Sequence, residues 1–247
     1  MRLRYIALYI EPPLDSGYSE QFIFNFNKNI RFISNYISKA IRKYKFETDG
    51  SFKMIAVQLN ANRNECIVDD YLNVLEVNLM VPYEEMVAYQ AMEDPEQRYE
   101  SYLTLLHRGY LLAQNVKQIP LDALLEIHDQ LRKNNYRNEW LFKKVRLPSY
   151  DMSIEFKCFF TSTEFRLQLE AYKLKTRELI TSGIVLETFP DELCYDFQFK
   201  KIEVKANILT ILGFLQTPFF KIDLDKIQKG IFNVEDIRIR EHFDIKI

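Results

Sequence analysis

The spacing of apolar residues changes along this chain of 247 residues, and these changes restrict its fold more than any other feature of the sequence. Residues 2–10 alternate and are rich in bulky side chains, which is typical of a strand. Between Ile30 and Tyr44 the apolar side chains recur at helical spacing, and Asp49-Gly50 ends that unit. Further strand patterns occur at residues 21–27, 52–59, 65–68 and 71–81. An early sheet packed by one amphipathic helix is therefore predicted.

The middle third of the chain has the periodicity of helices. Asp94 stands at a helix cap with Pro95 in the first turn, and an apolar stripe follows at residues 99–116. Residues 120–131 form a second stripe, rich in leucine, and residues 86–92 favour a short helix before the first. We expect the two longer helices to form an antiparallel hairpin.

The last third returns to strand patterns. They occur at residues 140–147, 152–160, 165–174, 184–188, 193–199, 201–206, 219–224 and 234–245. A helix is the alternative at residues 164–180, because Thr161 and Glu164 have the spacing of a helix cap, and we favour a strand there up to Leu174. The predicted fold class is α+β, with antiparallel sheets flanking a central helical hairpin and an amphipathic helix near the amino terminus. No linker rich in Pro, Gly or Ser divides the chain, so we expect one domain over residues 1–247. The alternative is a division into an α+β part with the hairpin at 1–148 and an antiparallel, β-rich part at 149–247.

Composition restricts the class of protein. The chain has 47% hydrophobic residues and a net charge of −2, which argues against intrinsic disorder and against a protein that coats nucleic acid. Three dispersed cysteines favour reduced thiols. The apolar run at residues 5–10 is too short for a signal peptide, and the longest uncharged stretch, at 206–220, is too short to span a bilayer. We therefore expect a cytoplasmic location without membrane insertion.

The glycines and histidines argue against common enzyme motifs. The six glycines lie no closer than 17 residues apart, which excludes glycine-rich phosphate loops and nucleophile elbows. His107, His128 and His242 do not have the spacing of a local zinc site. No cofactor and no metal is predicted.

One segment, Lys28 to Phe46, is basic and contains no acidic residue. Its cations are Lys28, Arg31, Lys39, Arg42, Lys43 and Lys45. At about 100° per residue they share an arc of about 160° opposite the isoleucine stripe, with Phe32 at its edge. The partner-binding residues predicted from this face are Lys28, Arg31, Phe32, Lys39, Arg42 and Lys43. The alternative is a solvated outer face balanced by the acidic residues between Tyr83 and Glu100.

A second candidate site is enzymatic. Pro190-Asp191 is followed by Glu203-Val204-Lys205, and this pattern resembles the Pro-Asp…Asp/Glu-x-Lys motif of restriction-endonuclease-like nucleases. The resemblance covers about 16 residues. It implies that Asp191 and Glu203 hold Mg²⁺ and that Lys205 positions or activates the attacking water.

Other polar residues have structural interpretations. Glu100 and His107 fall near one face of a predicted helix, as a carboxylate and a general base would, but a histidine at a packing boundary has the same pattern. His128 lies within a leucine stripe, which favours a core position. Asp69-Asp70 lies where two strands must turn, so a hairpin is predicted there.

These observations favour a binding protein. We expect a non-enzymatic cytosolic module that recognises another, charged protein, and an inhibitor or bacterial immunity-type protein that neutralises a toxin or nuclease fits by analogy. The alternative function is the metal-dependent nuclease using Asp191, Glu203 and Lys205. Nucleic acid is disfavoured as a partner of the binding module. A third possible function is that of a structural or assembly subunit, which would associate with itself.

Overall fold

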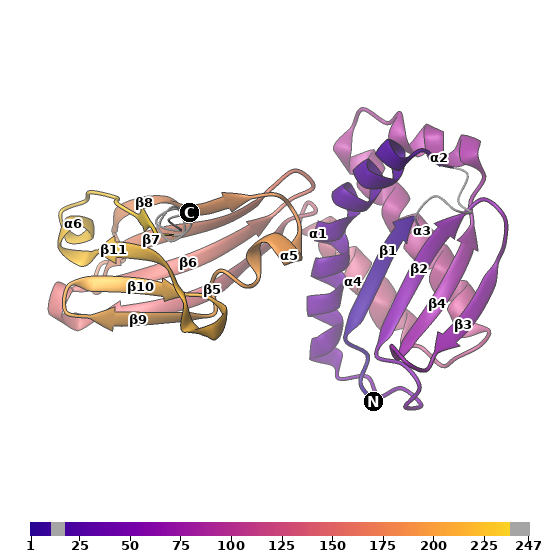
Figure 1. Ribbon diagram of the computed structural model, residues 1–247, viewed down its shortest axis with the longest axis horizontal. Helices are drawn as coiled ribbons and strands as arrows, with labels where there is room; N and C mark the ends of the chain where they lie inside the picture. The colour runs from indigo at the N-terminus through magenta and orange to yellow at the C-terminus, as the bar shows by residue number, and fades with distance from the viewer. Residues whose placement is uncertain (11–17, 238–247) are drawn as a thin grey trace, which may run out of the picture. The chain divides into compact units, whose positions relative to one another are not determined.

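The computed structural model describes residues 1–10 and 18–237, and the chain forms two compact units, Met1–Asn138 and Glu139–Ile247 (Figure 1). We call them unit 1 and unit 2. The division falls at residue 138, ten residues before the alternative boundary considered from the sequence. His242 and most of the strand predicted at 234–245 lie outside the described residues.

Unit 1 contains a four-stranded sheet with the order β1-β2-β4-β3. Its strands are β1 (Tyr5–Ile10), β2 (Met54–Asn60), β3 (Glu65–Asp69) and β4 (Val74–Met80). β1, β2 and β4 are parallel, and only β3 is antiparallel to its neighbour. The mixed α+β class is confirmed, but antiparallel pairing throughout is wrong for this sheet. A period of two residues predicts a strand and not its direction, whereas the long helix between β1 and β2 is the crossover that parallel strands need.

Helix α1 (Glu20–Tyr44) provides this crossover and packs on β1. The strand predicted at residues 21–27 is wrong, because the helix already begins at Glu20. Ser19 caps it by accepting a hydrogen bond from the backbone N–H of Phe22. Phe22, Ile23, Phe26 and Ile30 are buried at helical spacing, so the helical pattern starts two turns earlier than predicted.

Three further helices complete unit 1: α2 (Tyr83–Gln90), α3 (Pro95–Gln114) and α4 (Leu121–Lys133). The Asp94 cap of α3 is confirmed, since its carboxylate accepts from the backbone N–H of Glu96. α3 packs on the sheet, where Gly109 lies so close to Val57 that an added Cβ would come within 2.5 Å of a Val57 methyl group. α4 lies mainly against α1 and less against α3.

Unit 2 contains two antiparallel sheets. The first has the order β5-β6-β7-β8, formed by β5 (Asn138–Leu147), β6 (Met152–Phe160), β7 (Phe165–Lys173) and β8 (Leu179–Thr188). The second has the order β12-β11-β10-β9, formed by β9 (Lys201–Lys205), β10 (Ile208–Leu212), β11 (Pro218–Asp223) and β12 (Glu235–Asp236). The short helices are α5 (Glu192–Tyr195) and α6 (Leu224–Gln228), and η1 (Pro148–Tyr150) and η2 (Phe214–Gln216) are single 3₁₀ turns.

The core of unit 2 contains buried apolar side chains from both sheets and several aromatic rings. Phe165 of β7 stacks on Tyr195 of α5, with ring centroids 3.6 Å apart, and on Phe199, at 5.6 Å. The strand predicted at residues 193–199 is wrong. Asp191 caps a helical turn there, and that turn directs Tyr195 into the core.

None of the helices in the described ranges combines the length and the apolar character that crossing a bilayer requires.

Candidate functional site

The basic face predicted on α1 is divided by the structure. Phe32 does not belong to it: the side chain is 2% exposed and packs edge-on against Tyr99, with centroids 4.9 Å apart. Its position at the edge of the predicted arc places it in the core, because α3 and α4 cover that side of the helix. The remaining predicted residues are half-buried at Lys28, Arg31 and Lys39 and exposed at Arg42 and Lys43. The exposed cations are therefore confined to the carboxyl-terminal turn of α1.

Backbone pairing brings two further arginines to this turn. The backbone N–H of Leu3 donates to the carbonyl of Phe46 at 3.0 Å, and the N–H of Thr48 donates to the carbonyl of Met1 at 2.7 Å. The segment before β1 is thus paired with the segment that follows α1. Leu3 is buried, whereas Arg2 and Arg4 on either side of it are exposed.

These side chains surround a cavity of about 280 Å³, which we call the basic cavity. Its lining residues are Arg2, Leu3, Arg4, Tyr5, Arg42 and Lys45. Arg42 is held in place twice: its guanidinium lies 4.8 Å from the centroid of the Tyr5 ring, and its Nε donates to the carbonyl oxygen of Arg4 at 3.1 Å. A guanidinium with both an aromatic and a backbone contact has less orientational freedom to lose when it binds an anion.

The charge of the basic cavity is compensated in part only. Arg2 faces Glu47 at 3.8 Å, and both side chains are well exposed. Arg4, Arg42 and Lys45 form no ion pair with any acidic residue in the described part of the chain. The helix dipole favours cations in the last turn of α1, which accounts for Arg42 and Lys43 but not for Arg2 and Arg4. The surplus positive charge therefore makes this cavity suitable for an anionic group.

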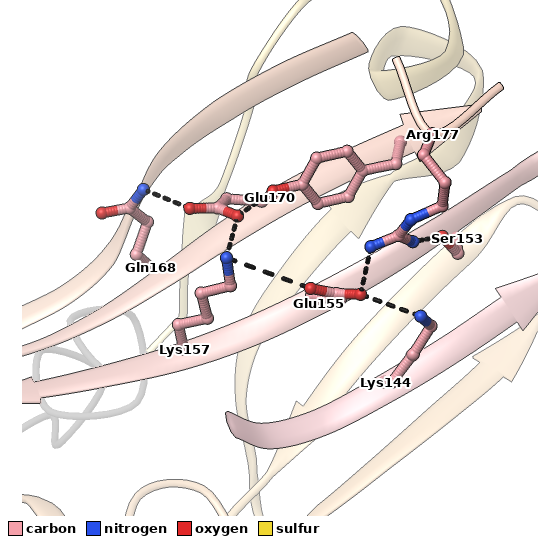
Figure 2. A network of polar contacts seen from close by, with 8 residues as sticks. Lys144, Ser153, Glu155, Lys157, Gln168, Glu170 and Arg177 are labelled. Carbon is pink, nitrogen blue, oxygen red and sulfur yellow. Dashed lines mark hydrogen bonds and ion pairs between the residues drawn. The ribbon is translucent and has the colours of Figure 1, made fainter. Parts of the chain in front are cut away.

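A second polar cluster lies on one face of the first sheet of unit 2 (Figure 2). Glu155 of β6 and Glu170 of β7 are directly opposite each other in the antiparallel register, an arrangement that destabilises a sheet when two like charges face each other alone. Here Lys157 bridges them, bonding Glu170 and lying 4.0 Å from Glu155. We call this cluster the sheet-face network.

Two more cations complete the sheet-face network from its other side. Lys144 of β5 and Arg177 reach the same carboxylate oxygen of Glu155, at 2.9 Å and 2.8 Å, and Figure 2 shows them converging on it. Arg177 also lies over the ring of Tyr172, 4.5 Å from its centroid. The hydrogen bond from Lys144, with that from Arg177, holds the pKa of Glu155 below its ordinary value. Since each cation already faces a carboxylate, this cluster stabilises the sheet and has little surplus charge for a ligand.

The nuclease-like residues have local partners. Asp191 accepts a hydrogen bond from the backbone N–H of Leu193 and so caps α5. Glu203 lies on β9, where its two carboxylate oxygens face Lys201 at 2.7 Å and Lys205 at 3.1 Å. Hydrogen bonds from Lys201 and Lys205 lower the pKa of Glu203, and the bond from Lys201 has the larger effect. Within residues 1–10 and 18–237, no group of three or more His, Cys, Asp or Glu side chains could hold a metal ion.

Glu100 of α3 forms an ion pair with Arg132 of α4, and not the pair with His107 considered from the sequence. Arg132 donates to the two carboxylate oxygens of Glu100 from Nε at 2.8 Å and from Nη2 at 3.0 Å, and the hydroxyl of Tyr136 also donates to Glu100. The Arg132 contact lowers the pKa of Glu100, as expected for a carboxylate that receives a charged donor. The core position predicted for His128 is confirmed, and so is the Asp69-Asp70 hairpin, whose turn is closed by Asp69 accepting from the backbone.

Sequence reasoning missed Arg2, Arg4 and Tyr5 as parts of the candidate site. The available signal was the alternation Arg2-Leu3-Arg4, which puts two cations on one side of an extended segment. Their proximity to α1 depends on pairing between residues more than 40 positions apart, which no local pattern encodes.

Comparison of the chain with known protein families, with curated proteins and with solved structures finds no match.

Proposed function

We propose that this protein is a non-enzymatic binding module that recognises an acidic protein through the exposed basic end of unit 1. The binding surface consists of Arg2, Arg4, Arg42, Lys43 and Lys45, with Tyr5 between them. One observation carries the proposal: Arg2 and Arg4 converge around one cavity with Arg42 and Lys45, which follow them by more than 30 residues in the sequence. Three of these four cations have no acidic partner in the part of the chain that is described. This surface replaces the longer helix face predicted from the sequence.

A protein suits this surface better than a nucleic acid does. Nucleic acids are bound through many phosphate contacts spread along a groove or helix, whereas these cations form one compact group. The net charge of −2 also gives the molecule no overall attraction for a polyanion. A compact basic patch on a near-neutral protein matches a small acidic patch on a partner protein, as in an inhibitor or immunity-type protein that captures an acidic toxin.

Charge reversal tests this function. In a triple variant carrying Arg4→Glu, Arg42→Glu and Lys43→Glu, we expect the affinity for a fluorescent oligoglutamate peptide to fall at least about tenfold, because attraction becomes repulsion at the same site. Fluorescence anisotropy measures the affinity. The matched control carries Arg63→Glu, Lys133→Glu and Lys175→Glu, which change the net charge equally at exposed positions elsewhere.

The same proteins serve as baits in a native lysate, with bound proteins identified by mass spectrometry. We expect an acidic protein that is retained by the wild type and by the control variant and lost by the triple variant. Equal oligoglutamate binding by all three proteins would contradict the proposal. Tighter binding of duplex DNA than of oligoglutamate by the wild type would instead identify a nucleic-acid partner.

A further inference from the structure

We infer that the basic cavity binds a phosphate monoester on the partner, so that the acidic protein it recognises is phosphorylated. The inference rests on the proposed function and specifies which chemical group enters the cavity. It depends on the charge, the donor geometry and the size of the basic cavity.

Charge favours a phosphate over a single carboxylate. Arg4, Arg42 and Lys45 carry three positive charges without an acidic partner among the described residues, and Arg2 adds a fourth that Glu47 compensates in part. One carboxylate supplies a single negative charge. A phosphate monoester supplies about 1.5 to 2 negative charges at neutral pH together with three strong acceptor oxygens.

The donors also have the geometry that phosphate requires. Three of the four cations are arginines, whose planar guanidinium groups bond phosphate oxygens in pairs. Arg42 is oriented before any ligand arrives, since its Nε is held by the carbonyl of Arg4 and its plane lies near the Tyr5 ring. Its two Nη atoms donate no hydrogen bond to the described residues, which leaves four N–H groups for an incoming oxyanion.

Size restricts the ligand to a single group. Pockets for small molecules are typically about 300 to 1,000 Å³, and the basic cavity, at about 280 Å³, lies just below that range. It accommodates one phosphorylated side chain and not an extended nucleotide. Recognition of phosphorylated segments by clustered arginines is a recurrent mode of peptide binding.

The experiment compares three peptides that differ at one position, which is phosphoserine, glutamate or serine, together with inorganic phosphate. Binding to the full chain is followed by nuclear magnetic resonance of the arginine Nε–H groups, which reports on Arg42 directly. We expect the phosphoserine peptide to bind about tenfold more tightly than the glutamate peptide and to shift the Arg42 signal. Arg4→Gln and Lys45→Gln are expected to weaken that binding at least about fivefold, whereas the matched control Arg63→Gln leaves it unchanged.

Each outcome decides between the alternatives. Equal affinity for the phosphoserine and glutamate peptides would overturn the phosphate inference and leave the proposed acidic partner in place. Inorganic phosphate binding as tightly as the phosphoserine peptide would overturn it in favour of a small free anion. Failure of both the phosphoserine peptide and oligoglutamate to bind would contradict the inference and the proposed function together.

Discussion

His128 is a buried histidine in unit 1, and one of its two ring nitrogens, Nε2, has no hydrogen-bond partner among the described residues. It is 1% exposed, its ring lies 5.6 Å from that of Tyr110, and neither His128 Nε2 nor the Tyr110 hydroxyl forms a hydrogen bond with the described residues. Burial lowers the pKa of His128 to about 4, and the positive charge of Arg132 contributes in the same direction. The side chain is therefore neutral in the folded protein at pH values where it is protonated in the unfolded chain.

This difference predicts a pH dependence of stability. The unfolded histidine, with a pKa of 6.5, takes up a proton before the folded one does, so the free energy of unfolding falls as pH decreases from 6.5 towards 4. At pH 5 the loss is about 2 kcal/mol. Urea denaturation at several pH values measures it. In His128→Leu this part of the pH dependence is expected to disappear, whereas the control His107→Gln retains it. An unaltered pH profile in His128→Leu would assign the effect to other groups.

The predicted start of α3 and most of the predicted strands are confirmed, whereas antiparallel pairing is wrong for the sheet of unit 1. Asp94-Pro95 placed the start of α3 correctly, because a cap and its helix are neighbours in sequence. The start of α1 was missed because the aromatic-rich residues 21–27 alternate enough to resemble a strand, while Ser19 lies just before them as a cap. The parallel pairing of β1 with β2 was missed because pairing is a non-local property.

The sheet-face network is expected to stabilise the first sheet of unit 2. Glu155→Gln removes the negative charge that Lys144, Lys157 and Arg177 share, and we expect a loss of about 1 to 2 kcal/mol of unfolding free energy at pH 7. The folded pKa of Glu155 is lowered, so its contribution is complete above the unfolded pKa of about 4.3 and is lost as pH falls through the folded value. The wild type and Glu155→Gln should therefore converge in stability as pH falls through the lowered pKa of Glu155.

Denaturation of both proteins across this pH range provides the measurement. Glu178→Gln is the matched control, because Glu178 lies in the exposed turn between β7 and β8 and pairs there with Lys173 at 2.7 Å, and such exposed pairs contribute little. A loss in Glu155→Gln no larger than that in Glu178→Gln would show that the sheet-face network does not stabilise the sheet.

This nearly neutral chain carries one group of charged side chains that is uncompensated and another whose charges are paired. The sequence itself gives the net charge of −2, and the basic segment of α1 indicates where cations are concentrated. Composition could not show that Arg2 and Arg4 join Arg42, nor that Phe32 is buried, since both depend on which elements cover the helix. In the sheet-face network, unlike the basic cavity, the cations are paired with carboxylates, which come from adjacent strands.

This distribution predicts how salt affects binding. A compact patch on a near-neutral protein attracts its partner only at short range, and the Debye length shortens from about 14 Å at 0.05 M salt to about 4 Å at 0.5 M. We expect the association rate with the acidic partner, or with oligoglutamate, to fall about tenfold over that range, with a smaller change in the dissociation rate. Surface plasmon resonance measures both rates. In the triple variant with reversed charges, salt should instead accelerate association, because it screens a repulsion. An association rate in the wild type that does not respond to salt would mean that contacts other than the basic cavity bring the partners together.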